Sequence, residues 1–259
     1  MTPTVKWLTN KLVTSFRREG FVGALKSCAA EVAEIRFDLK FGIDTLRWNE
    51  YSIPQGYERD LYVSYGPTKI GTLNNILDDL REIFRELRLH YEDFIFLDLG
   101  SGKGRTLLVA SQFPFRRIIG VEFSAELHSI AKKNIRAYKS ATQSCTAIES
   151  TCCDATAYRM PPENTVLFLF NPFKDPIVFQ LLTNLRESLQ SHPRQIYILY
   201  NNPVGHHLIV ESGFLEVVRV TKSYGIYKNK VLGPVRGVDA ITCTDTNGDN
   251  CFRLIQNNL

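Results

Sequence analysis

The order of apolar runs and helical stretches between residues 69 and 212 is the feature that most constrains the fold. Residues 73–87 place leucine, isoleucine and phenylalanine at helical spacing, and apolar runs of strand length then alternate with further helical stretches. The strand-length runs lie at 94–99, 117–122, 146–153, 165–170 and 195–200, and the helical stretches lie at 105–113, 124–138, 176–190 and 203–212. Strands that alternate with helices are joined by crossover connections, which build a parallel sheet with helices on both faces.

The last part of the chain has a different pattern, in which predicted strands follow one another without long helices. Residues 214–220, 239–244 and 251–256 have strand composition, and the last two runs flank Asn247-Gly248, a strong signal for a hairpin turn. We therefore predict an α/β fold with a doubly wound, mostly parallel seven-stranded sheet. Its C-terminal antiparallel hairpin is expected at 239–256, and residues 61–259 are expected to form this main domain.

Residues 1–60 are aromatic-rich and lack the regular alternation that follows them. The apolar side chains of Val5, Leu8, Leu12 and Phe16 recur at helical spacing, which predicts an amphipathic helix. We interpret residues 1–60 as an N-terminal helical extension that either packs on the main domain or covers a substrate as a lid. A helix lying on a membrane surface is a third alternative.

Charge and cysteine content narrow the class of protein. No apolar run approaches the ~20 residues of a membrane span, and the N-terminus shows no signal-peptide pattern, so a cytoplasmic protein is expected. The six cysteines form no Cys-x-x-Cys pair, and we expect free thiols, including Cys243 and Cys251, and no metal site. The net charge of the chain is +4, but residues 1–30 and 222–236 together carry +8, which is consistent with either an acidic partner or a solvated surface.

A cluster of glycines, "FLDLGSGKGR" at residues 96–105, follows the first predicted strand. A Walker loop is excluded, because no glycine precedes Lys103 at the position of its first glycine, and Gly104 occupies its Ser/Thr position. The spacing G-x-G-x-G also differs from the dinucleotide pattern G-x-G-x-x-G. S-adenosylmethionine fits better, because loop N–H groups can bind its carboxylate while Asp98 faces its cationic end.

Two further acids follow later predicted strands. Glu122 ends the second run and can accept hydrogen bonds from both ribose hydroxyls, as the acid in dinucleotide folds does. Asp154, with Ala155 beside it, follows the third run and can accept from the exocyclic amine of adenine. Taken singly, Glu122 is also compatible with an ordinary surface acid, and Asp154 with a helix cap.

Four motifs occur in order at the ends of the predicted strands. They are Asp98-Leu99-Gly100-Ser101-Gly102-Lys103-Gly104, Glu122, Asp154-Ala155 and Asn171-Pro172-Phe173. This set resembles the Rossmann-like class I S-adenosylmethionine (SAM)-dependent methyltransferases over residues 60–259. The resemblance implies SAM as cofactor, S-adenosylhomocysteine as product, and a cofactor site made of Thr68, Asp98, Gly100, Ser101, Gly102, Gly104, Arg105, Glu122, Phe123, Asp154, Ala155 and Asn171.

The resemblance also bears on the methyl acceptor. Asn171-Pro172-Phe173 is similar to the motif of amino-methylating enzymes, although a single proline stands before the aromatic residue where that motif has two. Tyr65-Gly66-Pro67-Thr68 is similar to a segment of seven-strand protein-lysine methyltransferases. We expect an acceptor nitrogen, such as that of a protein lysine, and catalytic roles for Asn171, Pro172, Phe173 and Tyr65. The extension at 1–60 is expected to shape the choice of acceptor rather than the affinity for SAM.

Other functions remain open at this point. They are a small-molecule N- or O-methyltransferase of a biosynthetic pathway, and a protein that binds SAM without transfer. The partner implied in each enzymatic case is an amine-bearing protein or small molecule, with nucleic acid as a weaker alternative. None of the five histidines lies directly at a predicted strand end, which disfavours oxygen acceptors that need a histidine base.

Overall fold

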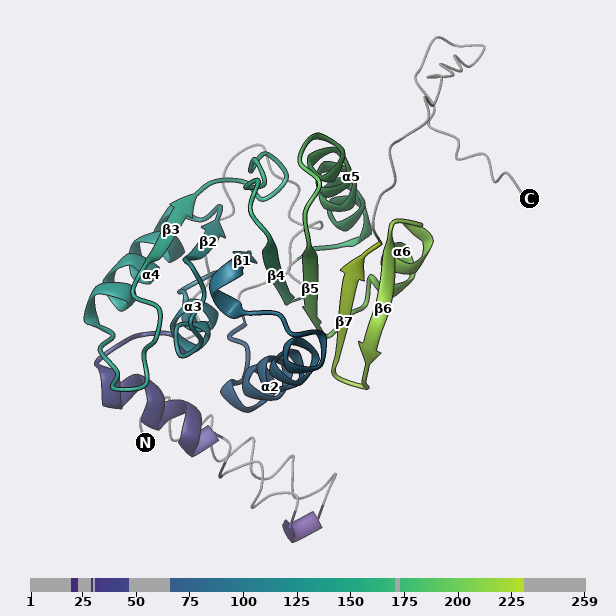
Figure 1. Ribbon diagram of the computed structural model, residues 1–259. Coiled ribbons are helices and arrows are strands. Elements are labelled where there is room, and N and C mark those ends of the chain that lie inside the picture. Colours follow the sequence, from purple (N-terminus) through teal and green to yellow (C-terminus); the bar gives the residue numbers. More distant parts are fainter. Residues whose placement is uncertain (1–19, 23–28, 30, 47–65, 171–172, 231–259) are drawn as a thin grey trace, which may run out of the picture.

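The structure, a computed structural model, describes residues 20–22, 29, 31–46, 66–170 and 173–230. In this part of the chain a seven-stranded sheet lies between helices (Figure 1). The strands are β1 (Ile95–Leu99), β2 (Ile118–Glu122), β3 (Ile148–Cys152), β4 (Thr165–Phe170), β5 (Ile196–Asn201), β6 (Leu215–Val220) and β7 (Tyr224–Asn229). The helices are α2 (Ile70–Leu87), α3 (Arg105–Ala110), α4 (Ala125–Ala137), α5 (Asp175–Ser191) and α6 (His206–Glu211), with a 3-10 turn η2 (Tyr91–Asp93). Residues 31–41 are also helical.

The strand order β3-β2-β1-β4-β5-β7-β6 follows from the crossovers. Strands β1 to β5 pair in parallel, whereas β7 runs antiparallel to both β5 and β6. The chain moves outward from β1 to β3 and then returns to place β4 on the other side of β1. The carboxyl ends of β1 and β4 therefore form the switch point at which open α/β sheets bind ligands.

Alternating side chains of the strands divide the interior into two cores. Along β1, Phe96 belongs to the core under α2, whereas Ile95 and Leu97 belong to the core under α5, as the period of two in a strand requires. Helix α2 buries one stripe of side chains, which consists of Leu73, Ile76, Leu77, Leu80, Ile83 and Phe84. This double coverage explains why β1 and β2 are buried along their whole length.

The predicted fold class is confirmed, but the seventh strand is formed by other residues than expected. Strand β7 is Tyr224–Asn229, within a stretch that the sequence suggested only as basic surface. Its Gly225 weakens the apolar pattern, but a Cβ at that position would stand 2.3 Å from the hydroxyl of Tyr227, so the packing requires glycine. The hairpin predicted at 239–256 lies outside the described residues.

The described part of the N-terminal extension packs on the end of α4. The ring centroids of Phe37 and Phe41 lie 6.0 and 4.5 Å from that of Tyr138, whose side chain is 1% exposed. Such aromatic pairs add about 0.5–1.5 kcal/mol beyond the area that they bury. The helix predicted around Val5–Phe16 lies outside the described residues.

Two further observations concern the described residues only. None of their helices is both long enough and apolar enough to cross a membrane, and no group of three or more His, Cys, Asp or Glu side chains is placed to hold a metal. Cys145, Cys152 and Cys153 are free thiols, and Cys152 is exposed because β3 is an edge strand. The other cysteines lie outside the described residues.

Candidate functional site

The glycine cluster forms a loop between β1 and α3 whose backbone explains its composition. Gly100, Gly102 and Gly104 have φ angles of 85°, 53° and 82°, in the left-handed region that favours glycine. The N–H groups of Gly100 and Ser101 donate to Val121 O at 2.9 and 3.0 Å, which ties the loop to the end of β2. The glycines therefore permit three left-handed residues within five positions.

Glu122, the last residue of β2, anchors this loop through a side-chain hydrogen bond. Its side chain is buried, and Oε2 accepts a hydrogen bond from Gly102 N at 2.8 Å while Oε1 accepts from Ser124 N at 2.9 Å. Burial raises the pKa of Glu122, whereas the backbone donors of Ser124, Gly102 and Phe123 lower it. A carboxylate has about four acceptor positions, so it retains capacity for the hydroxyl groups of a ligand.

Asp98, in β1, is the second buried acid at the carboxyl edge of the sheet. Its side chain is 3% exposed, and burial together with the negative charge of Glu122 raises its pKa to about 8, while a hydrogen bond from the Thr106 side chain opposes the rise. A neighbouring cation would favour the ionised form of Asp98. Two interacting buried acids at one edge of the sheet suit a ligand that carries both a positive charge and hydroxyl groups.

Asp154 lies at the same edge, beyond the end of β3. Cys152 pairs with Glu122 in the sheet register, and Cys153 N donates to Glu122 O at 3.1 Å. Asp154 Oδ1 accepts from both the N–H and the hydroxyl of Thr156, at 2.7 and 2.8 Å. Oδ1 of Asp154 thus stabilises a local turn. Contact between the second carboxylate oxygen of Asp154 and an adenine amine stays a prediction.

Several other predicted site residues occupy positions beside this edge. Thr68 is buried just before α2, Ala155 is buried after β3, and Phe123 is partly exposed after β2. Ser101 is buried, and its Oγ has no hydrogen-bond partner among the described residues. A Cβ on Gly120 would stand 2.7 Å from this oxygen, so Gly120 makes room for the loop.

Of the four predicted catalytic residues, the structure describes only Phe173. Phe173 is 5% exposed and belongs to the core under α5, together with Val178 and Leu181. Its burial favours a packing role over the predicted contact with an acceptor. Tyr65, Asn171 and Pro172 lie outside the described residues, and their roles stay predictions.

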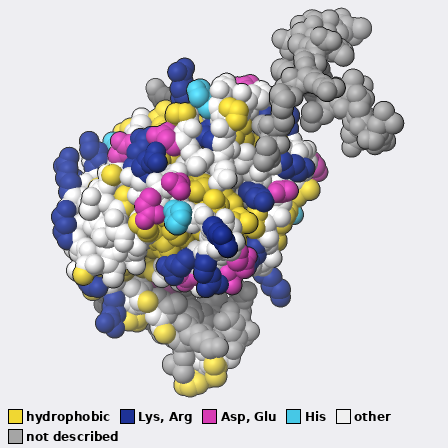
Figure 2. Space-filling view, in the orientation of Figure 1, with side chains coloured by type: hydrophobic (Ala, Val, Ile, Leu, Met, Phe, Trp, Pro, Cys, Tyr) yellow, Lys and Arg dark blue, Asp and Glu magenta, His cyan; other side chains and the backbone are white. Residues whose placement is uncertain are grey.

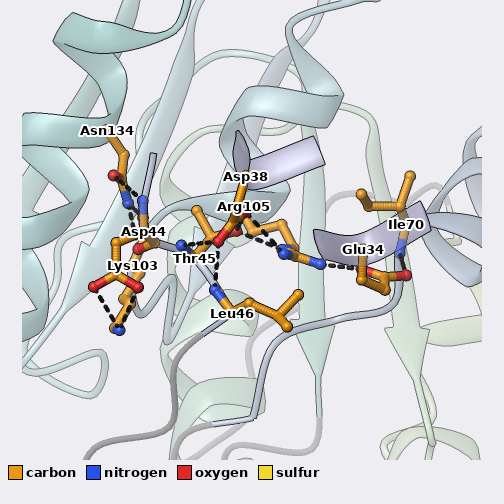
Figure 3. A network of polar contacts seen from close by, with 9 residues as sticks. All are labelled: Glu34, Asp38, Asp44, Thr45, Leu46, Ile70, Lys103, Arg105 and Asn134. Atoms are coloured by element: carbon orange, nitrogen blue, oxygen red, sulfur yellow. Dashed lines mark hydrogen bonds and ion pairs between the residues drawn. The ribbon is translucent and has the colours of Figure 1, made fainter. Parts of the chain in front are cut away.

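The side chain of Arg105 has a different environment from the one expected for a cofactor ligand. It points toward the N-terminal segment, where Nη1 pairs with Glu34, Nη2 lies 3.0 Å from Asp38 Oδ1, and Nε donates to Thr45 Oγ1 at 2.6 Å (Figure 3). The side chain is 2% exposed. We therefore assign Arg105 to the support of the loop rather than to direct contact with a cofactor.

Lys103 points to the same segment and completes this network. Its Nζ lies 3.2 Å from both carboxylate oxygens of Asp44, and its carbonyl oxygen accepts from Asn134 Nδ2 at 2.9 Å (Figure 3). Asn134 also exchanges hydrogen bonds with the backbone of Asp44 in both directions, each at 2.9 Å. Residues 34–46 therefore dock against the glycine loop through side chains on both sides of Gly104.

The acids of this network are not among the predicted site residues, because only the aromatic and basic residues of 1–60 suggested a role. One signal was present, since Glu34 and Asp38 are four residues apart and so share one face of a helix. Two acids on one face of a packed helix need a cationic partner, and Arg105, directly after the glycine loop, pairs with both. The sequence did not indicate which cation this was.

A separate hollow of about 970 Å³ lies at the opposite edge of the sheet. Its lining includes residues that precede β1, β2, β4 and β5, among them Arg116, Glu163 and Arg194. Ligands of parallel sheets bind at the carboxyl ends of the strands, so this hollow is not the site formed by Asp98 and Glu122.

Comparisons with known proteins agree with these features. Residues 52–148 match the model of a protein family described as "Histone methylation protein DOT1"; this span includes the Tyr-x-Pro-Thr segment, the glycine loop and Glu122. No curated protein sequence matches the chain.

Solved structures with a similar arrangement are distant from this chain. An RNA methyltransferase from Salinibacter ruber in complex with S-adenosyl-L-homocysteine is 18% identical, with a TM-score of 0.40, over 67% of this chain and 97% of that one. A ribosomal protein L11 methylase from Lactobacillus delbrueckii subsp. bulgaricus is 14% identical, with a TM-score of 0.43, over 70% of this chain and 91% of that one. The assignment of the fold rests on the strand order and the family match.

Proposed function

We propose that this chain, which has the class I SAM-dependent methyltransferase fold, transfers a methyl group from SAM to a nitrogen atom of a protein, with lysine as the acceptor residue. The fold and the family match identify an enzyme that uses SAM. The observation that carries the proposal is the left-handed glycine loop fixed by Glu122 beside the buried Asp98, at the switch point of the sheet.

The chemistry of this edge fits SAM. The backbone N–H groups at the start of α3 suit its carboxylate, Asp98 suits its ammonium group, and Glu122 suits its ribose hydroxyls. Asp154 and Ala155 are proposed to contact its adenine. Bound SAM supplies a methyl carbon activated by a positively charged sulfur.

The acceptor nitrogen must present a lone pair to that carbon. A lysine is protonated near neutral pH, with an ordinary pKa of about 10.4, so the enzyme must favour its neutral form. Burial and a neighbouring positive charge both lower the pKa of an amine. We propose that Asn171 accepts a hydrogen bond from the remaining N–H and so aims the lone pair, with Tyr65 against the carbon chain.

One observation favours a protein as acceptor, since the family match carries a description that names histone methylation. In the middle of the face shown in Figure 2, Lys and Arg side chains are interspersed with Asp and Glu and do not form the basic patch or stripe that typically marks a nucleic-acid-binding surface. An oxygen acceptor or a small molecule is an alternative outcome of the following experiment.

The proposal is tested by incubating the full chain with methyl-labelled SAM and a cell extract separated into protein, nucleic acid and small molecules. We expect enzyme-dependent label in protein that survives nuclease treatment. Label confined to nucleic acid or small molecules would contradict the protein acceptor. Tight binding of SAM without label in any fraction would indicate a binding protein.

The raised pKa of Asp98 predicts that SAM affinity depends on pH. Below pH 8 the ligand-free protein holds Asp98 protonated, and a cationic ligand favours its ionised form, so binding releases a proton. The affinity should fall as pH is lowered from 8 to 6, by up to about tenfold per unit. Calorimetry in two buffers of different ionisation enthalpy measures both the affinity and the released proton.

The variant Asp98→Asn is the matched control for this pH dependence. It keeps the size of the side chain and removes its titration, so SAM should bind more weakly and with a flat pH profile. A slope equal to that of the wild-type protein would assign the titration to another group.

The proposed role of Asn171 predicts a loss of turnover without a loss of cofactor. Asn171→Ala should lower kcat by about tenfold or more, because misaligned reactants lose near-attack geometry. The affinity for SAM should stay within about threefold, because the side-chain oxygen of Asn171 is proposed to face the acceptor rather than the cofactor. Normal transfer by this variant would remove Asn171 from the reaction.

A further inference from the structure

We infer that Glu34 is a positioning residue that sets the spacing between two segments of the proposed cofactor site. One segment is the glycine loop, and the other consists of residues 66–69 ahead of α2. The inference rests on the proposed function, because it assigns Glu34 a role in SAM binding.

The two carboxylate oxygens of Glu34 contact different segments. Oε1 accepts a hydrogen bond from Ile70 N at 2.9 Å, and Oε2 pairs with Nη1 of Arg105 (Figure 3). Ile70 is the first residue of α2, and Arg105 is the first residue of α3, directly after Gly104. One side chain thus connects the starts of the two helices that follow the two segments.

The N-terminus of α2 has no local substitute for this contact. Lys69 occupies its cap position and makes no side-chain hydrogen bond to the helix, and the first turn carries no acid. The N–H groups at a helix start need acceptors, and a carboxylate is favoured there by the helix dipole. Glu34 supplies such an acceptor from a distant part of the chain.

Burial makes this bridge firm. The Glu34 side chain is 8% exposed and that of Arg105 is 2% exposed, so water competes little for the pair. Two further acids of the N-terminal segment hold the glycine loop, because Asp38 pairs with Arg105 and Asp44 pairs with Lys103. Ion pairs with the N-terminal segment therefore fix the two side chains that flank Gly104. We infer that these pairs also restrain the loop from moving away from α2.

A ligand that contacts both Thr68 and the glycine loop binds with higher affinity when the spacing between them is already fixed. If the two segments separated freely, binding would have to restore their spacing at a cost in affinity. Coupling between sites is reciprocal, so SAM should in turn stabilise the contact between Glu34 and Ile70. This differs from the initial expectation that residues 1–60 leave SAM affinity unchanged.

Glu34→Gln separates the two halves of the bridge. A glutamine has one side-chain carbonyl oxygen, which can accept from Ile70 N, while its amide group donates and so opposes Arg105. We expect the Kd for SAM to rise about tenfold or more, with kcat at saturating SAM within about threefold of the wild-type value. SAM should slow hydrogen exchange at Ile70 N in the wild-type protein and should do so much less in Glu34→Gln.

Asp38→Asn is the matched control, because Asp38 pairs with the same Arg105 but makes no contact to Ile70. Its Kd for SAM should stay within about threefold, even where its thermal stability falls as far as that of Glu34→Gln. Binding is measured below the unfolding transition of each variant, verified by circular dichroism. A wild-type Kd in Glu34→Gln, or equal weakening in Asp38→Asn, would overturn the inference alone. Failure of the wild-type chain to bind SAM would overturn it together with the proposed function.

Discussion

Gly102→Val is expected to abolish measurable SAM binding, with a Kd at least about 100-fold higher than that of the wild-type protein. Gly102 has a φ angle of 53°, which a β-branched residue adopts only with strain, and its N–H is bound to Glu122. Such strain costs about 1–3 kcal/mol, and the side chain would also stand where the ligand approaches the backbone. Each 1.4 kcal/mol lost from binding raises Kd tenfold. Isothermal calorimetry provides the measurement.

Gly213→Val is the control that separates backbone strain from the site. Gly213 also has a left-handed φ, of 75°, and a Cβ there would meet nothing within 4 Å. It follows α6, away from the glycine loop, so Gly213→Val should lose stability while its SAM affinity stays within about twofold. Equal loss of binding in the two variants would mean that SAM affinity reports only on general stability.

Arg105→Met is expected to lower the free energy of unfolding by about 3–5 kcal/mol, because it leaves the buried Glu34 and the partly buried Asp38 without their cation. The Glu34 and Asp38 side chains are 8% and 13% exposed, and both pair with this guanidinium. Methionine retains an apolar stem of similar length, so the change removes mainly the charge and its hydrogen bonds. Urea denaturation measures the loss.

The same substitution at an exposed ion pair provides the comparison. Lys228 pairs with Glu216 at 3.2 Å, with side chains 38% and 44% exposed, and Lys228→Met should cost about 1 kcal/mol or less. A similar small cost at Arg105 would contradict the view that the N-terminal segment is clamped to the glycine loop by buried charges.

The parts of the fold that follow local rules could be predicted from the sequence. Strands β1, β2 and β4 lie within predicted apolar runs, and β5 extends one residue past its run. The helices between these strands require parallel crossovers, so alternation alone defined most of the sheet. Strand β7 could not be found in this way. Its Gly225 is required by the ring of Tyr227, and such packing is visible only once the sheet is assembled.

In the candidate site, too, the residues close to strand ends could be predicted, whereas contacts between residues distant in sequence could not. Glycine spacing and acids at strand ends marked the loop, Asp98 and Glu122, because those residues act within a few positions of a strand end. The contacts of Arg105 could not be predicted, since its partners Glu34 and Asp38 are 71 and 67 residues away in sequence. The burial of Phe173 likewise depends on α5, which packs over it only in the folded chain.

The identity of the labelled atom tests the central claim most directly. The protein that becomes labelled in the extract experiment is hydrolysed in acid, and its amino acids are separated beside methylated lysine standards. The account predicts label in methyl-lysine, abolished by Gly102→Val and retained by Gly213→Val. Label released as methanol by mild base, as from a carboxylate ester, or recovered in methylated nucleosides, would contradict it.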